Sequence, residues 1–438
     1  MTWLFWTRRI PQSYEMKILI TACACTPFAG SENYVGWSVV QCLAKHHELW
    51  VITSGRNQSD IERATAEGMV LPNVTFAYSH RPGPWHSNAM LARLQSWNEY
   101  RKFTKAALIL GRELHQSVKF DLVHHVTITT WRIGLPFWRL GIPFVWGPIG
   151  GGEQFPFKLY SILSRSSKIF ELVRSMSNVV STYSPAVRNC ARHAAHITAA
   201  NDETKQRLLK LRRKESGVSV LSQAFYSRAR IDGYSAPESQ RKLSGPLRFF
   251  AGGMVEGRKG VALAFAALAR LKRQGLEFSY CVGGIGPELR HLHGLVEYFG
   301  LRENVVFGIW KGTDYANQLA SSHIYLLPSL RESTGLTMME AMLAGCVPII
   351  ADCGGPALIV TETCGWKIPV GNAAAMIDGL AAAIDAADKD RSILQRKGAE
   401  ARKRIATGYS EDAYYEAIDD IYRNVTNHRV GGERVQSL

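Results

Sequence analysis

The chain has 438 residues, of which 46% are hydrophobic and 20% charged, and its formal net charge is +15. This composition is typical of a soluble globular protein, and the length predicts two domains because one core rarely grows this large. No apolar run reaches the roughly 18 residues needed to span a bilayer, which excludes a membrane-spanning class. The eight cysteines are scattered, without a C-x-x-C pair or a zinc-type cluster, which predicts reduced thiols in a cytoplasmic protein and no metal site.

The first residues, MTWLFWTRRIPQSYE (1–15), allow two interpretations. The segment is too short for a signal peptide. Its aromatic residues beside Arg8 and Arg9 fit an interfacial anchor, whereas MKILIT at Met16 resembles a natural start, and we favour the second interpretation.

The positive charge is confined to the first half of the chain. Residues 1–245 hold 31 Lys and Arg against 16 Asp and Glu, whereas residues 246–438 hold 21 of each. A half-chain with a charge of +15 attracts nucleic acid, an anionic membrane or a charged substrate, unless it is simply a basic, well-solvated surface.

Apolar, β-branched runs alternate with helix-length segments along the whole chain, which predicts strands at 17–23, 48–54, 74–79, 121–127, 143–148, 196–200 and 218–222, and then at 247–254, 277–284, 304–310, 323–329 and 347–352. Continuous apolar strands separated by helices are typical of parallel sheets covered on both faces. The fold class is therefore α/β, with two Rossmann-like domains. The polar, turn-rich segment 234–245 is the predicted linker.

The segment RESTGLTMMEAMLAG (331–345) predicts a loop and a helix directly after a strand. Ligands of parallel sheets bind where such loops enter helices, and the free N–H groups of Gly335 and Leu336 suit an anion. Glu332 lies on the loop, and Glu340 lies about one turn inside the helix, where it can accept two vicinal hydroxyls. The layout suits a sugar, a diphosphate and a ribose, although a plain helix cap with an exposed glutamate fits the spacing equally well.

A second anion feature is the strand-to-helix loop that contains Arg258, Lys259 and Gly260. Arg can clamp a diphosphate bidentately and Lys can act as a point charge, although basic pairs at helix starts are also common on surfaces. The segment GGIGPE (283–288) lacks the G-x-G-x-x-G pattern and is a poor NAD site.

These motifs resemble a known family. PSLRESTGLTMMEAMLAGCVPIIADCGGPALIV, with its E-x₇-E pattern, and FFAGGMVEGRKGVALAFAAL and YCVGGIGPELRHL occur in the order and spacing of retaining glycosyltransferases of family 4, over most of residues 246–425. MKILITACACTPFAGSENYVGWSVVQCLAKHHELWVITS and DLVHHV match more loosely. GSENYVGW and WGPIGGGE resemble a subgroup found in bacterial surface-polysaccharide synthesis.

The resemblance implies the GT-B fold, in which two Rossmann-like domains face each other across a cleft. Residues 16–235 would form the acceptor-binding domain and residues 246–410 the nucleotide-sugar-binding domain. Residues 411–438 would form a helix and tail that cross back to the N-terminal domain.

The resemblance also implies roles for three catalytic residues. Glu332 contacts the donor sugar hydroxyls and steadies the positively charged transition state, and Lys259 neutralises the leaving diphosphate. The family usually has an Arg six residues before this Lys, where this chain has Gly253, so we assign that role to Arg258.

Five residues are implied to bind the donor. The amides of Gly335 and Leu336 hold the diphosphate, with Thr337 beside them, and Glu340 holds the ribose hydroxyls. Gly30, in the first strand-to-helix loop, lets backbone approach the phosphates from the other domain.

On the acceptor side, the family's histidine is replaced by GPIGGGE. The residues that could face the acceptor in its place are His124, His125 and Glu153. For at least one of the two histidines, the commoner alternative is a histidine buried in a strand.

The expected function is therefore that of a retaining, metal-independent, hexosyltransferase-type enzyme. It would transfer a sugar from a UDP- or GDP-linked donor, without another cofactor, to a glycan or lipid-linked acceptor in exopolysaccharide or O-antigen synthesis. Alternatives are a GT-B relative such as an epimerase or phosphorylase, or a basic membrane- or nucleic-acid-binding protein. No lysine site for pyridoxal phosphate and no nucleic-acid-binding motif supports those alternatives, and we expect no nucleic-acid partner.

The segment 154–180 predicts a further partner. It mixes apolar and aromatic residues with Lys158, Arg165, Lys168 and Arg174 and contains one acid. Such a helix can lie on the anionic inner membrane surface, which would make a cytoplasmic enzyme peripherally attached. The alternative is an ordinary helix with its apolar face in the core.

Overall fold

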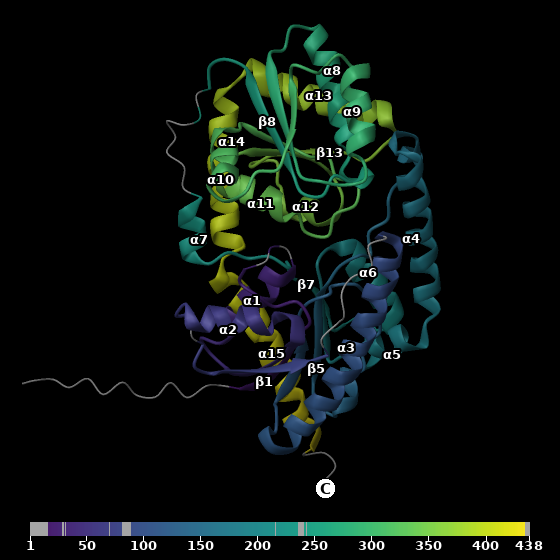
Figure 1. The fold of residues 1–438 in the computed structure, drawn as a ribbon, viewed down its shortest axis with the longest axis vertical. Coiled ribbons are helices and arrows are strands. Elements are labelled where there is room, and N and C mark those ends of the chain that lie inside the picture. The colour runs from purple at the N-terminus through teal and green to yellow at the C-terminus, as the bar shows by residue number, and fades with distance from the viewer. Residues whose placement is uncertain are drawn as a thin grey trace, which may run out of the picture. The chain divides into compact units, whose positions relative to one another are not determined.

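The computed structural model describes residues 16–28, 30, 32–69, 71–80, 89–214, 216–234, 241 and 243–433. Segment 1–15 and most of the predicted linker 234–245 lie outside these residues, so both interpretations of the N-terminus stay open. Within the described residues the chain forms two parallel sheets with helices between the strands (Figure 1).

The first sheet has the strand order β3-β2-β1-β4-β5-β6-β7. Its strands are β1 (Lys17–Ala22), β2 (Glu48–Ser54), β3 (Val74–Ser79), β4 (Leu122–His125), β5 (Phe144–Ile149), β6 (His196–Ala199) and β7 (Val218–Val220). The register pairs Ile18 of β1 with Leu49 of β2 and with Leu122 of β4. The order reverses direction between β1 and β4, which makes a topological switch point.

The second sheet has the order β10-β9-β8-β11-β12-β13. Its strands are β8 (Leu247–Gly252), β9 (Phe278–Gly283), β10 (Val305–Gly308), β11 (Ile324–Leu326), β12 (Val347–Ala351) and β13 (Trp366–Ile368). The order reverses between β8 and β11, where Ile324 pairs with Phe249. The predicted α/β class with two Rossmann-like sheets is confirmed, and of the described strands only the short β13 was not predicted.

The helices are α1 (Glu32–Leu43), α2 (Gln58–Ala66), α3 (Ala89–Val118), α4 (Arg165–Tyr183), α5 (Pro185–His193), α6 (Asp202–Arg212), α7 (Arg228–Gly233), α8 (Val261–Arg273), α9 (Leu289–Tyr298), α10 (Gly312–Ser321), α11 (Leu336–Leu343), α12 (Gly354–Ile359), α13 (Ala373–Lys389), α14 (Ser392–Gly408) and α15 (Glu411–Glu433). Helices α8, α9 and α13 group together beside the second sheet, and α10, α11 and α14 form a separate group (Figure 1). Helix α11 buries Met338, Met339 and Met342 in the core. Both faces of this parallel sheet are therefore covered, as its apolar strands require.

The chain divides into two compact units. The first comprises the described residues up to Ile128, Leu135–Trp146, and the chain from Tyr422 onward. The second comprises Thr129–Gly134 and Gly147–Ile421. The domain boundaries expected from the sequence stay a prediction.

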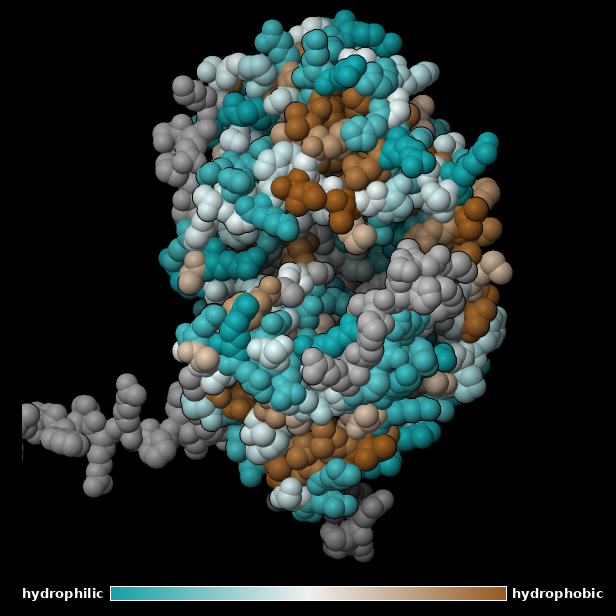
Figure 2. Space-filling view, viewed as in Figure 1, coloured by the Kyte–Doolittle hydropathy of each residue, from teal (hydrophilic) through white to brown (hydrophobic). Residues whose placement is uncertain are grey.

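Helix α4, in the second unit, has its polar side chains inside and its apolar side chains outside. Its buried residues are Ser167, Glu171, Arg174 and Asn178. Its exposed large residues are Ile169, Leu172, Val173, Met176, Val179, Val180 and Tyr183. They form the apolar edge at the right of Figure 2, where Figure 1 places α4.

This inversion corrects two expectations for the segment 154–180. The apolar face does not enter a core, and Arg174 does not face outward, since it is buried against Glu153. A 3₁₀ turn over Phe157–Ile162 precedes the helix, so the segment is not one continuous helix. Among the described residues, none of the helices has both the length and the apolar character to cross a membrane.

Candidate active site

Two loops meet at the switch point of the second sheet. One follows β8 and ends in a 3₁₀ turn over Gly257–Lys259, and the other follows β11 and leads into α11. Because β8 and β11 are neighbours, both loops leave the same edge of the sheet, where ligands of open α/β sheets bind. Gly260 is required after the first turn, since its φ is +71° and a Cβ there would collide with the carbonyl of Pro328.

The carboxylate of Glu332 contacts both basic residues of the first loop. Arg258 donates to it from Nη1 at 3.1 Å, and Lys259 forms a close ion pair with the same oxygen. Arg258 also donates to the carbonyl of Arg331 at 2.7 Å. The predicted catalytic residues Glu332, Lys259 and Arg258 therefore form one cluster.

The charges in this cluster shift the pKa of each member. Burial alone would raise the pKa of Glu332, but the adjacent Lys259 and Arg258 lower it to about 2. Burial lowers the pKa of Lys259, and Glu332 opposes that effect. Burial also disfavours the charged form of Arg258, yet the carboxylates of Glu332 and Glu256 hold its pKa above the ordinary value.

The N-terminus of α11 borders the same cluster. Gly335 caps this helix with a φ of +94°, a conformation that L side chains rarely adopt. A small cavity is bounded by Gly335, Glu332 and Lys259. The helix start, with the amide of Leu336 as its first N–H group, thus lies beside the two cations, which is a suitable place for a diphosphate. Gly253, at the position where the family usually has an Arg, has no side chain that could bind a ligand in this cavity.

The carboxylate of Glu340, on α11, is hydrogen-bonded to side chains from other segments. It accepts a hydrogen bond from Arg230 at 2.9 Å and another from the Tyr315 hydroxyl at 2.8 Å. Burial and the nearby Glu340 raise the pKa of Tyr315. A carboxylate has about four acceptor sites, so capacity for ligand hydroxyls remains. Thr337 instead donates to the carbonyl of Gly252 at 3.0 Å, which ties α11 to the end of β8.

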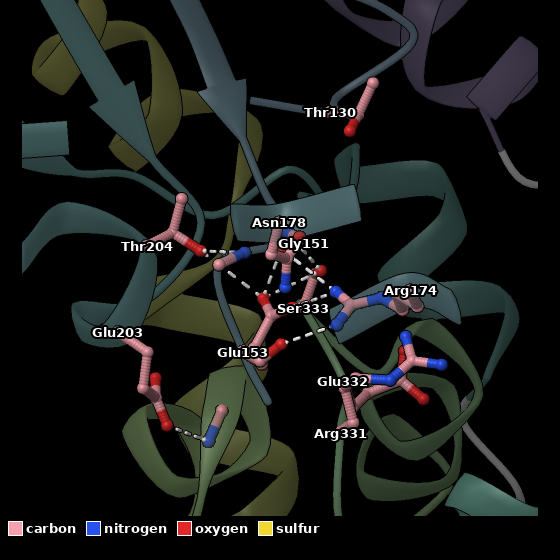
Figure 3. Close-up of polar contacts among 12 residues, drawn as sticks. Thr130, Gly151, Glu153, Arg174, Asn178, Glu203, Thr204, Arg331, Glu332 and Ser333 are labelled. Atoms are coloured by element: carbon pink, nitrogen blue, oxygen red, sulfur yellow. Dashed lines mark hydrogen bonds and ion pairs between the residues drawn. The ribbon is translucent and has the colours of Figure 1, made fainter. Parts of the chain in front are cut away.

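Glu153, an acceptor-side candidate, holds the residue that follows Glu332. Ser333 donates to it at 2.9 Å, and the Gly151 amide donates at 3.3 Å. Arg174 lies 3.8 Å from the carboxylate, and Asn201 donates to it as well. Figure 3 shows Glu153 in the middle of this network. Because Glu153 is only 3% exposed and surrounded by donors, it positions the loop.

Arg331, the residue that precedes Glu332, is held by α4. Its Nε and Nη2 donate to the two carboxylate oxygens of Glu171 at 3.1 and 2.6 Å. Both side chains are nearly buried, with 12% and 3% of their surfaces exposed. The loop is thus fixed on both sides of Glu332.

The remaining predicted residues lie in the first unit. His124 and His125 are fully buried on β4, bonded to the Tyr422 hydroxyl at 2.6 Å and to Thr21 and Tyr100 at 2.9 and 3.0 Å. Neither side chain is open to an acceptor in this structure, because each belongs to the core of its unit. Gly30 is exposed in the loop between β1 and α1, and a Cβ there would meet no atom within 4 Å.

Several residues of the site escaped the sequence analysis. Arg230 and Tyr315 come from segments far from Glu340, and Glu171 and Arg331 are separated by 160 residues. No local pattern marks such pairs. One signal was available, since Glu171 is the single acid between residues 154 and 201.

Comparison with known proteins supports the expected class. Residues 236–404 match the family described as Glycosyl transferases group 1. A protein of Escherichia coli K12 named for glycosyl transfer in colanic acid biosynthesis, WcaL, is 28% identical over 65% of this chain and 70% of its own length. The amylovoran biosynthesis glycosyltransferase AmsK of Erwinia amylovora is 31% identical over 31% of this chain and 35% of its own.

The fold has solved counterparts. The Anabaena protein HepE, crystallised with UDP and glucose, superposes with a TM-score of 0.59 at 16% identity and covers 93% of this chain and 100% of its own. The predicted GT-B fold class is therefore confirmed. The matches favour glycosyl transfer over the epimerase, phosphorylase and nucleic-acid-binding alternatives.

Proposed function

We propose that this chain is a retaining glycosyltransferase that moves a hexosyl group from a nucleotide-diphosphate donor to a glycan or lipid-linked acceptor. The observation that carries the proposal is the ion-paired Glu332, held by Lys259 and Arg258 beside the start of α11. Relatives named for colanic acid and amylovoran biosynthesis support a surface polysaccharide, such as an exopolysaccharide or O-antigen, as the product.

The charges of the cluster are opposite in sign to the charges that would develop in the reaction, and so would stabilise them. Breaking the bond between the anomeric carbon and the phosphate oxygen leaves positive charge on the sugar and negative charge on the diphosphate. Glu332 would stabilise the first, while Lys259, Arg258 and the amides of Gly335 and Leu336 would stabilise the second. These cations and the helix start would take the place of a metal ion.

Retention would follow from attack on the same face of the sugar. The acceptor oxygen bonds to the anomeric carbon as the phosphate oxygen leaves, and that phosphate oxygen takes the acceptor's proton. Glu332 and Glu340 would not act as an acid and nucleophile pair, since Glu340 would hold the ribose and only one carboxylate would lie at the anomeric carbon.

A UDP- or GDP-linked sugar is the proposed donor, with no further cofactor. The complex of HepE with UDP and glucose supports testing UDP-glucose first. Incubation with UDP- and GDP-sugars, with membrane extract as acceptor source, should release the nucleotide and label a glycan, and should do so in EDTA. No release from any donor would contradict the proposal, and activity lost in EDTA and restored by Mg²⁺ would contradict metal independence.

We also propose that the enzyme works in the cytoplasm, attached peripherally to the anionic inner membrane surface through α4. Support comes from the exposed apolar side chains of this helix and from Lys158, Arg165 and Lys168 near its start. The single acid between residues 154 and 201 is Glu171, which is buried with Arg331. The exposed part of this stretch thus carries cations and apolar groups, a composition that suits anionic headgroups above acyl chains.

A further inference from the structure

A cavity in the second unit is lined by basic side chains from two neighbouring helices. Helix α5 contributes Arg188 and Arg192, and helix α6 with its C-terminal cap contributes Arg207, Lys210 and Arg213. Their spacing of three to four residues places the side chains of each helix on one face, toward the space between the helices.

These five cations form no ion pair with a described acid. Burial lowers the pKa of the Arg207 guanidinium, and the charge of Glu153 acts on it at longer range and opposes that effect. Among the residues that the structure describes, none of the five lies within 4.0 Å of a carboxylate oxygen. The guanidinium of Arg207 stacks over the Trp131 ring at 4.9 Å, and its buried Nε has no hydrogen-bond partner. Positive charges that outnumber the nearby negative ones repel one another, so an anionic ligand would stabilise this arrangement.

Two carboxylates also line the cavity, and both are engaged elsewhere. Glu153 accepts from Ser333 and Asn201, as described above. Glu203 accepts from the Gly354 amide at 2.8 Å. Five positive charges and two negative ones leave a net charge of three positive units. In magnitude this is close to the negative charge of a diphosphate ester and larger than that of a single sugar carboxylate.

One wall of the cavity is formed by the loop that carries Glu332 and by the start of α12. Leu330 of the loop and Gly354 of α12 line it, and the next amide of α12, that of Gly355, donates to the carbonyl of Glu332 at 2.9 Å. Glu153 borders the cavity and also holds Ser333. A ligand in this cavity would therefore contact residues that are bonded to the Glu332 loop or belong to it.

We infer that this cavity binds a phosphate or diphosphate group carried by the sugar acceptor. The inference rests on the proposed function, because it assigns the group to an acceptor. Arginine binds phosphate oxygens bidentately and suits this ligand better than lysine alone would. The donor's own diphosphate has a different site, at Lys259 and the start of α11, so the enzyme has two anion sites with separate tasks.

Direct binding tests the cavity without requiring turnover. Inorganic diphosphate is titrated calorimetrically into the protein saturated with UDP, which occupies the donor site. We expect binding that weakens at least tenfold in Arg192→Gln/Lys210→Gln. The matched control is Arg273→Gln/Arg302→Gln, which removes two exposed cations outside the cavity and should bind as the wild type does. No binding to the UDP-saturated wild type, or equal weakening in both variants, would overturn the site.

A second measurement distinguishes the source of the anion. Farnesyl diphosphate in detergent should bind more tightly than inorganic diphosphate if the ligand is a lipid-linked acceptor, whereas a phosphorylated glycan should bind more tightly if the acceptor is a glycan. Equal affinity for all three would overturn the assignment to an acceptor and leave an anion site.

Turnover separates this inference from the proposed function. With a working acceptor, Arg192→Gln/Lys210→Gln should raise the KM for the acceptor at least tenfold and leave the KM for the nucleotide sugar unchanged. An unchanged acceptor KM would contradict the acceptor role. If no nucleotide sugar is turned over, the proposed function fails while the calorimetric result still stands.

Discussion

Glu332 stays ionised at any pH at which the enzyme is expected to work, because Lys259 and Arg258 hold its pKa at about 2. A group that must face developing positive charge gains from this fixed ionisation, since no proton has to leave before the reaction begins. The cations that hold Glu332 in the free protein are also those expected to meet the donor diphosphate. Donor binding should therefore loosen the ion pair and release the carboxylate toward the sugar.

Glu332→Gln keeps the size of the side chain and removes its charge. We expect turnover to fall by a factor of ~10² or more, the scale of losing one electrostatic contact in the transition state. Steady-state kinetics measure the effect, and circular dichroism confirms folding, since Lys259 and Arg258 lose their counter-charge. Wild-type turnover in a folded variant would remove Glu332 from the chemistry.

Glu340→Ala should act on binding rather than on turnover. Loss of hydrogen bonds from a charged acceptor to the ribose should weaken UDP or GDP by about 1.5–3 kcal/mol. Calorimetry with the nucleotide alone measures this. Tyr315→Phe is the control, since it removes a protein contact to the same carboxylate and leaves the carboxylate in place. Equal nucleotide affinity in wild type and Glu340→Ala would contradict the ribose assignment.

His125 predicts a pH dependence of folding stability. Burial, with a smaller effect of His124, lowers its pKa from 6.5 to about 3. The unfolded chain therefore binds a proton between these values that the folded chain does not, so the stabilisation is complete above about pH 6.5 and is lost as pH falls toward 3.

Between pH 7 and pH 5 this single group should reduce the free energy of unfolding by about 2 kcal/mol. Urea unfolding of the wild type and of His125→Gln at both pH values measures it. The variant should have a lower free energy of unfolding at pH 7, and that free energy should fall less between pH 7 and pH 5 than in the wild type. An equal fall in both proteins would show that groups other than His125 control the pH dependence of stability.

At the scale of elements, the loop between β11 and α11 is held by partners outside its own sheet. Glu171 of α4 binds Arg331, and Glu153 binds Ser333. This arrangement is expected to fix the direction of Glu332 as well as to stabilise the loop.

A single and a double variant separate the two effects. Glu171→Leu leaves Arg331 buried and unpaired, which should cost about 3–5 kcal/mol in the free energy of unfolding. Glu171→Leu/Arg331→Leu replaces the buried pair by apolar groups and should recover most of that stability. If the pair positions Glu332, the double variant should still turn over about tenfold more slowly than wild type. Recovery of both stability and turnover would make the pair purely structural.

The strands and the α/β class were predictable because buried parallel strands are continuous apolar runs. Strand β13 escaped because Trp366–Ile368 is too short to form such a run. The loop with Arg258 and Lys259, and that with Glu332, were also predictable from motif spacing. Their mutual contact follows from the strand order, since β8 and β11 are neighbours.

The orientation of α4 was not predictable in the same way. Helical periodicity reports two unlike faces and does not say which one is inside. The buried face holds Glu171, Arg174 and Asn178, whose partners lie in other segments. Only those long-range partners make a polar interior face favourable, because a buried charge without them costs several kcal/mol.

At the scale of the whole molecule, α4 offers one explanation for the excess positive charge: cations near this helix would bind an anionic membrane surface. Cations near an anionic surface each contribute about 1 kcal/mol, so a few of them with one apolar helix face suffice for reversible attachment. We expect the protein to sediment with phosphatidylglycerol vesicles at low salt, to be released by high salt, and to ignore phosphatidylcholine vesicles.

A matched pair of variants assigns this binding to α4. Ile169→Asp/Val180→Asp should abolish co-sedimentation, whereas Tyr298→Asp/Val306→Asp, at exposed apolar positions elsewhere in the second unit, should not. Sedimentation velocity in the absence of vesicles checks whether a second copy covers the helix instead. Vesicle binding that is absent, indifferent to salt, or equal in both variants would contradict the membrane assignment.

The three residues 331–333 each have a different set of partners, and this has a consequence for how the protein can change over time. Adding or removing one residue in the loop would shift the frame, so that Arg331 or Ser333 would stand where the carboxylate of Glu332 belongs. Substitutions elsewhere in the loop keep that frame, whereas a change of length destroys it. In distant relatives, the number of residues between the end of β11 and the start of α11 should therefore be a more dependable marker of the same chemistry than the identity of the residues there.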